Sequence, residues 1–342
     1  MEKHLSFLDK YLPLWIFLAM AVGVSIGYFK PDAPSTIEAN NTTEHTDFLL
    51  ASGLILMLLP PLTKVRYEKL GNVFKDKKGL SISLTLNWII GPLLMFFLSV
   101  GLLSSEPGYM YGLIMIGLAR CIAMVLVWNE LAKGDTEYAT GLVALNCLFQ
   151  LIFYPAYAFL FIYIFPEWMN LPTIDPIKSI SIGIIAKNVG IYLGIPFLIG
   201  GSLNLILRKN KGENWFYKKF IPKISPITLI ALLFTIVIMF SYKGREIVEL
   251  PQKVILVSFP LILYFLIMFF ISFWYTRHVN MEYAKSTAIS FTATGNNFEL
   301  AIAVCIATFG IDSDEAFAAV IGPLIEVPTL ILLVKYALRK RP

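Results

Sequence analysis

The side chains of this sequence that could do chemistry lie inside long apolar runs, where charge is rare. Arg120, Glu299 and Glu326 are ionisable groups deep within such runs, and Cys121 places a thiol directly beside Arg120. A charge facing lipid there would cost roughly 2.5–3.5 kcal/mol, so these side chains should face the protein interior and pair or titrate. An interaction between Arg120 and Glu299 is one such pairing.

Cys121 differs from the other two cysteines in its surroundings. Cys147 and Cys305 lie in uninterrupted apolar stretches and are predicted to be inert packing residues. Cys121 ends the stretch 117–121 (GLARC), in which a glycine weakens the helix and the neighbour of the thiol is charged. This thiol is therefore a candidate ligand.

A second polar cluster, 292–299 (TATGNNFE), corresponds to the first, because Arg120 falls on Asn297 at an offset of 177 residues. Paired interruptions of this kind are typical of the binding site of a secondary transporter, although each alone could serve close helix packing. Unwound backbone at that depth must line a cavity or be buried in protein. The uncharged polar side chains available to a substrate there are those of Asn146, Asn296 and Asn297.

The composition indicates a membrane protein. Of the 342 residues, 57% are hydrophobic and 15% are charged, and the mean hydropathy is +0.71, whereas soluble domains carry about 25% charged residues. This composition excludes a soluble enzyme, a disordered chain and a nucleic-acid binder. The net charge of +5 is then explained by basic residues in cytoplasmic loops, which set the orientation of the protein in the membrane. The histidines are near ends or in loops and no catalytic or phosphate-binding motif is present, so we expect neither an enzyme nor a cofactor.

Ten apolar runs predict an all-α polytopic membrane protein of ten transmembrane helices. The predicted spans are 11–29, 48–64, 80–103, 109–128, 139–165, 188–207, 224–241, 254–275, 284–308 and 315–338. Basic residues gather in 64–79, in 208–223 and in the C-terminal tail, which ten spans place on one side. Both termini should therefore be cytoplasmic.

The two halves of the chain match at the same offset of 177 residues. The matched landmarks are Lys10 with Lys187, Gly23 with Gly200, Asp135 with Asp312, and Ala139 with Ala316. Five spans per half is an odd number, so the second half must be inverted in the membrane. The sequence thus predicts two inverted five-helix repeats, 1–165 and 176–342, in which helices 4 and 9 are broken.

The motifs at the two breaks closely resemble those of the arsenical-resistance arsenite permease family, within the superfamily of bile acid, arsenite and riboflavin transporters. The matching stretches are 87–92 (NWIIGP), 117–125 (GLARCIAMV), 127–135 (VWNELAKGD), 290–301 (SFTATGNNFELA) and 322–328 (GPLIEVP). The resemblance covers essentially all ten spans. It implies a panel domain of spans 1, 2, 6 and 7 and a core domain of spans 3–5 and 8–10, where helices 4 and 9 cross.

The resemblance also implies a function: export of arsenite, and in many members of antimonite, driven by protons across the plasma membrane, the inner membrane in a bacterium. Cys121 then corresponds to the metalloid ligand, and the other matching site residues are Arg120, Trp128, Asn146 and Asn297, with Glu299 and Glu326 for proton coupling. A sodium-coupled organic-anion symporter of the same superfamily is an alternative, but the Arg120–Cys121 pair does not suit a sodium site. A membrane sensor or receptor is a third possibility, which the short loops disfavour.

Overall fold

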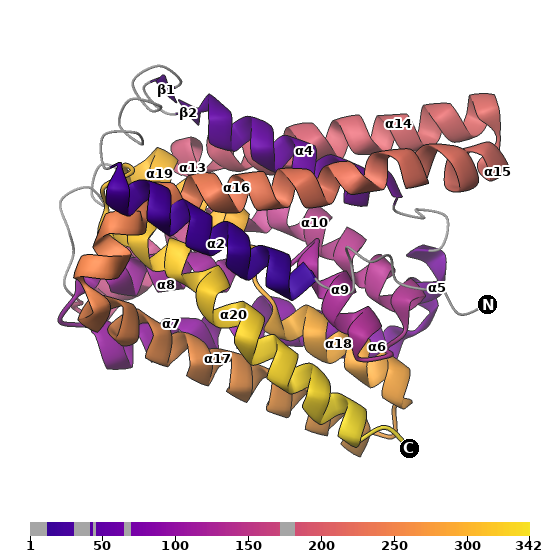
Figure 1. The fold of residues 1–342 in the computed structure, drawn as a ribbon. Coiled ribbons are helices and arrows are strands. Elements are labelled where there is room, and N and C mark those ends of the chain that lie inside the picture. The colour runs from indigo at the N-terminus through magenta and orange to yellow at the C-terminus, as the bar shows by residue number, and fades with distance from the viewer. Residues whose placement is uncertain (1–11, 31–41, 44–45, 65–69, 172–181) are drawn as a thin grey trace.

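The computed structural model describes residues 12–30, 42–43, 46–64, 70–171 and 182–342, and these are almost entirely helical (Figure 1). Two very short strands, β1 (Thr42–Thr43) and β2 (Thr46–Asp47), pair antiparallel. The N-terminal residues predicted to be cytoplasmic, and residue 176 as the start of the second half, lie outside the described residues.

The helices follow the chain with few long connections. In the first half they are α2 (Leu12–Phe29), α4 (Phe48–Lys64), α5 (Leu70–Lys75), α6 (Lys77–Thr85), η2 (Leu86–Ile90), α7 (Gly91–Leu103), α8 (Pro107–Leu118), α9 (Met124–Leu131), α10 (Thr136–Phe159), η3 (Leu160–Ile164) and α11 (Phe165–Trp168). In the second they are α13 (Ile182–Val189), η4 (Gly190–Gly194), α14 (Ile195–Lys211), α15 (Glu213–Trp215), η5 (Phe216–Phe220), α16 (Ile221–Glu249), α17 (Pro251–His278), α18 (Tyr283–Thr294), α19 (Phe298–Phe309) and α20 (Asp314–Arg339). The η elements are single π-helical segments.

The structure has the helix lengths and the surface of a multi-pass membrane protein. Within the described residues, six continuous helical stretches are long and apolar enough to cross a bilayer: 77–103, 136–168, 182–211, 213–249, 251–278 and 314–339. Large apolar side chains on these stretches point outward; Ile152, Leu198 and Ile230, for example, are each exposed by about two thirds (67%, 68% and 67%). In water such a surface would be unstable, whereas in lipid it is the expected one.

Each π-helical segment is explained by a proline two residues after its end. Pro92, Pro166, Pro196 and Pro222 occupy these places. Proline lacks an N–H and its ring clashes with the carbonyl four residues earlier, so a wider turn relieves the clash but leaves that carbonyl without its helical partner. For Pro92 this carbonyl is that of Trp88, which accepts a hydrogen bond of 2.8 Å from the Tyr157 hydroxyl.

The helices pack in two groups. In the first, α16 contacts α2 and α4, and α4 contacts α14. The second set of contacts joins α7, α8, α17, α18, α19 and α20. Figure 1 shows the first group along one side of the molecule, while α7, α17 and α20 lie on the other. Helix α13 joins the groups, since it continues through η4 into α14 of the first group and contacts α19 of the second.

Two helical stretches are interrupted in the middle of the second group. Helix α8 ends at Leu118 and α9 begins at Met124, while α18 ends at Thr294 and α19 begins at Phe298. Both interruptions fall at the polar clusters that the sequence singled out. Four half-helix ends are thereby brought to one place.

Helices α2 and α16 pack closely at two pairs of positions where glycine leaves no side chain between the backbones. A Cβ on Gly27 would lie 2.3 Å from the carbonyl oxygen of Ser241, and one on Gly244 would lie 2.7 Å from that of Val24. Small residues let helices approach closely, which drives packing within a membrane. The Gly23–Gly27 pair in the sequence is a signal of this close packing.

We expect Gly244→Ala to destabilise the protein by about 1–3 kcal/mol, because the new methyl group meets backbone rather than a movable side chain. Thermal unfolding of the purified protein in detergent, followed by tryptophan fluorescence, measures the effect. Gly101→Ala is the control, since a Cβ there meets nothing within 4 Å. Equal unfolding temperatures for the two variants would contradict close packing of α2 against α16.

Candidate functional site

The two interrupted segments are joined to each other by their backbones. The Cys121 N–H donates to the carbonyl of Gly295 over 3.3 Å, and the Asn297 N–H donates to that of Ala119 over 3.0 Å. Between them, Arg120 and Asn296 form an antiparallel bridge. We call the place where the two interrupted segments meet the crossing. Its short two-stranded pairing satisfies backbone N–H and carbonyl groups that have no helical partner inside the membrane.

Cys121 lies in the interruption, three residues before α9 begins, and is only 3% exposed. Its sulfur accepts a hydrogen bond of 3.2 Å from the N–H of Val125, the second residue of that helix. Cys147 and Cys305 are buried within the continuous helices α10 and α19, and neither touches a helix break in the contacts described. Of the three thiols, that of Cys121 has the free amide groups of a helix N-terminus next to it.

Arg120 is completely buried, and its side chain binds neutral oxygens. It donates to the hydroxyl of Tyr264 over 3.0 Å, to the carbonyl of Ala293 over 3.4 Å, and to the carbonyl of Gly117. The predicted interaction with Glu299 is absent. The guanidinium instead donates through its two terminal nitrogens to carbonyls at the ends of α8 and α18 and to Tyr264, while its Nε has no partner among the described residues.

These contacts place the positive charge of Arg120 at one pair of half-helix ends. Gly117 and Ala293 are the second-last residues of α8 and α18, so Arg120 lies on the negative ends of both half-helices. The positive ends of the other two half-helices, α9 and α19, are left facing the crossing beside Cys121 and Asn297. That half of the crossing favours an electron-rich ligand.

Asn296 and Asn297 each use part of their side chain in the fold and leave part unused. The Asn296 Nδ2 donates to the carbonyls of Ile116 (2.8 Å) and Ala119 (3.2 Å), and the Asn297 Oδ1 accepts the N–H of Leu300 (3.1 Å), which caps α19. The Asn296 Oδ1 and the Asn297 Nδ2 are buried and have no hydrogen-bond partner in the part of the chain that the structure describes. A bound ligand could supply these partners.

Two carboxylates lie near the thiol. An Oε1 of Glu326, on α20, accepts the N–H of Asn296 over 3.4 Å, and the side chain is 4% exposed. A Cβ on Gly295 would lie 3.1 Å from Cβ of Cys121 and 3.4 Å from that same oxygen, so both side chains lie against this glycine. Glu299 lies in the first turn of α19, two residues after Asn297, and is partly exposed.

Asn146 and Trp128 are buried but do not touch Cys121 in the contacts described. The Asn146 carboxamide accepts from Nε1 of Trp88 (3.2 Å) and donates to Asn87 (3.3 Å). Trp128 lies one turn after Val125 on α9, and its Nε1 is buried without a partner. Asn146 therefore binds Trp88 and Asn87 rather than the crossing, and the Trp128 indole N–H has no acceptor among the described residues.

Sequence reasoning missed two residues that hold the crossing together. Gln150, one turn after Asn146 on α10, accepts the backbone N–H of Arg120, and Tyr264 of α17 accepts from its guanidinium. The four-residue spacing of Asn146 and Gln150 on one helix face was an available signal. Nothing in the sequence links Tyr264 to Arg120.

No group of three histidine, cysteine or acidic side chains that could hold a metal ion occurs in the part of the chain that the structure describes. A thiophilic substrate would thus meet a single thiol with amide, backbone and carboxylate groups around it.

Comparison with known proteins places the chain among transporters. The model of the sodium bile acid symporter family matches residues 51–250. The chain is 46% identical over 331 residues to the arsenical-resistance protein Acr3 of Corynebacterium glutamicum, covering 97% of this chain and 89% of that protein. It is 29% identical over 361 residues to the Acr3 protein of Alkaliphilus metalliredigens (99% and 94% covered), and 29% identical over 354 residues to an uncharacterized transporter of Synechocystis (97% and 88% covered).

Proposed function

The chain belongs to the sodium bile acid symporter family and to its arsenical-resistance members, and from this premise we propose that it exports trivalent arsenic from the cytoplasm in exchange for protons. The family is one of transporters rather than enzymes, as the sequence motifs predict. The observation that carries the proposal is the Cys121 thiol at the crossing of two broken helices. Antimonite, which has the same soft chemistry, is a second substrate of the proposed site.

The chemistry of trivalent arsenic suits this thiol. Soft centres prefer thiolate ligands, and arsenite is mostly the uncharged trihydroxide at neutral pH. When the Cys121 sulfur binds arsenic, one As–O bond breaks and the departing hydroxide leaves as water with one proton. If the sulfur starts as a thiol, that proton is its own. If it starts as a thiolate, a neighbouring carboxylic acid supplies it, and Glu299 is our candidate for this donor.

We further propose ten spans in two inverted repeats, 1–165 and 176–342, with a panel domain of spans 1, 2, 6 and 7 and a core domain of spans 3–5 and 8–10. The packing of α2, α4, α14 and α16 as one group supports this division, and so do the two breaks at matching positions. Movement of one group against the other would expose the crossing to each side in turn.

The proposed orientation has both termini in the cytoplasm of a bacterium, with the protein in the plasma membrane. It is supported by the basic segments: α5, the turn between α14 and α15, and the C-terminal end all lie at the right-hand end of the molecule in Figure 1. Positive loops stay on the cytoplasmic side.

Arsenite uptake into everted membrane vesicles tests the proposed function. We expect an acid-inside pH gradient to drive accumulation, a protonophore to abolish it and an imposed sodium gradient to leave it unchanged. Accumulation that needs sodium, or transport of organic anions without arsenite, would replace the proposal by the sodium-coupled symporter.

Gly295→Ala should reduce this transport several-fold without loss of protein. Its Cβ would stand 3.1 Å from Cβ of Cys121, a distance tighter than ordinary van der Waals contact, and would press the thiol and Glu326 apart. The measurement is the initial rate of arsenite uptake at equal protein levels. Gly190→Ala, where a Cβ meets nothing within 4 Å, is the control, and equal rates for both variants would argue against a site at this glycine.

A further inference from the structure

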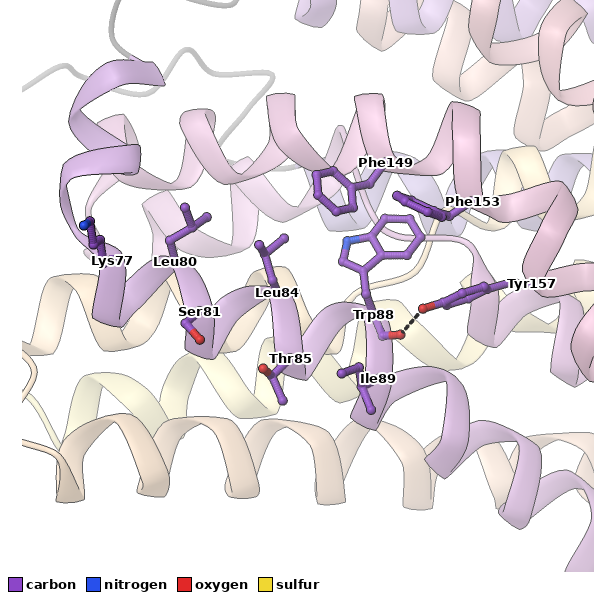
Figure 2. A pocket seen from close by; sticks show the side chains of 10 residues that line it. All are labelled: Lys77, Leu80, Ser81, Leu84, Thr85, Trp88, Ile89, Phe149, Phe153 and Tyr157. Atoms are coloured by element: carbon purple, nitrogen blue, oxygen red, sulfur yellow. Dashed lines mark hydrogen bonds between the residues drawn. The ribbon is translucent and has the colours of Figure 1, made fainter.

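An apolar groove of about 440 Å³ opens on the outer surface between α6–η2 and α10, away from the crossing. Figure 2 shows Leu84 and Trp88 on one wall, with Phe149 and Phe153 on the other. Trp88 is 5% exposed and lies at the base of the groove, while Phe153 is 39% exposed at its edge.

The groove has charge at one end. Lys77 begins α6 beyond the apolar lining (Figure 2), its side chain is exposed, and it has no ion-pair partner within the described residues. From Lys77 to Trp88 the helix rises roughly 16 Å, which is about the hydrocarbon thickness of one bilayer leaflet.

The acidic side chain next to Lys77 is already paired. Asp76 accepts hydrogen bonds from Lys285 (3.0 Å) and from the Gly79 N–H, and Lys78 donates to the carbonyl of Val279. Partial burial raises the pKa of the Asp76 carboxyl, but the Gly79 and Lys285 contacts outweigh this and hold it below its usual value. Lys77 is therefore a cation that an external anion can neutralise.

We propose that this groove binds an anionic phospholipid, with its phosphate at Lys77 and one acyl chain along Leu84, Trp88 and Phe153. The exposed hydroxyl of Ser81 lies one turn after Lys77 and can donate to the same phosphate. A zwitterionic lipid fits the apolar part equally well but brings its own cation towards Lys77, so the site should select for net negative charge.

The floor of the groove leads to the crossing. Trp88 donates to Asn146, and Gln150, one turn further along α10, accepts the N–H of Arg120. An acyl chain packed on Trp88 would hold the indole that orients Asn146. The lipid is thus a structural partner of the helix that supports the site.

Native mass spectrometry of the detergent-purified protein tests the proposal, with phosphatidylglycerol and phosphatidylcholine of the same acyl chains as probes. The wild type should prefer phosphatidylglycerol. Lys77→Gln should weaken phosphatidylglycerol binding roughly fivefold and leave phosphatidylcholine binding unchanged. Ser81→Trp, which fills the groove from an exposed position, should weaken both, and Lys209→Gln, an exposed cation on α14, should change neither.

Equal binding of both lipids by the wild type and by Lys77→Gln would overturn the proposal. So would undiminished phosphatidylglycerol binding by Ser81→Trp. A dimer in the spectra that disappears in Ser81→Trp would also overturn it, because the groove would then be an interface between two copies of the chain.

Discussion

Replacing Cys121 by alanine should reduce arsenite accumulation in everted vesicles to that of vesicles without the protein. The thiol is the soft ligand at the crossing, where the N-terminal amides of α9 face it and the Val125 N–H already contacts its sulfur. Alanine removes this ligand but fits the same space, so the amount of protein in the membrane should be unchanged.

The other two cysteines provide matched controls for this experiment. Cys147→Ala and Cys305→Ala should retain most transport, because both thiols are buried in continuous helices. Each loses only a little packing volume. If either variant were as inactive as Cys121→Ala at equal protein levels, a site with several thiolates would replace the single-thiol site.

Glu299→Gln should abolish the effect of a pH gradient, lowering gradient-driven accumulation at least tenfold, while arsenite still flows down its own concentration gradient. Glu299 lies in the first turn of α19, next to the crossing, where the proposed movement of the two helix groups would open it to water on each side in turn. Glutamine keeps the size and hydrogen bonding of the side chain and removes its titration. The measurement is arsenite uptake with and without an imposed gradient at equal protein levels.

Glu326→Gln is the companion variant, and we expect it to do less harm. Its oxygen accepts the N–H of Asn296, and the carboxamide oxygen of glutamine can accept the same bond. At 4% exposure Glu326 has poorer access to solvent protons. Full gradient-driven accumulation by Glu299→Gln, with loss in Glu326→Gln, would move the coupled proton to Glu326.

The sequence was informative about where the chain breaks and poor about what holds the breaks together. Glycine and polar residues weaken a helix locally, so the interruptions at 119–123 and 295–297 could be located from residue types alone. The partners of Arg120 depend on packing between helices distant in sequence. Glu299 is two residues past Asn297, a rotation of about 200° around α19, so the matched offset of 177 was no guide to its contacts.

The backbone geometry near the prolines also depends on residues distant in sequence. The positions of the prolines in apolar runs predict disturbed helices, yet the responses differ: four prolines follow a π-helical segment, whereas Pro155 and Pro260 lie inside the α-helices α10 and α17. A wider turn leaves a carbonyl that another group must satisfy. For Trp88 that group is the Tyr157 hydroxyl, 69 residues later in the chain. Local propensity could not identify it.

The contacts of Arg120 have a consequence for how the protein is made. Two of its acceptors, Tyr264 and Ala293, are 144 and 173 residues further along the chain. While the ribosome is still synthesising the second half, Tyr264 and Ala293 do not yet exist. Of the three acceptors, the guanidinium then has only the Gly117 carbonyl. A lone arginine at that depth is costly. The early helices should therefore stay beside the insertion machinery, and the crossing should close late, when α17 and α18 arrive.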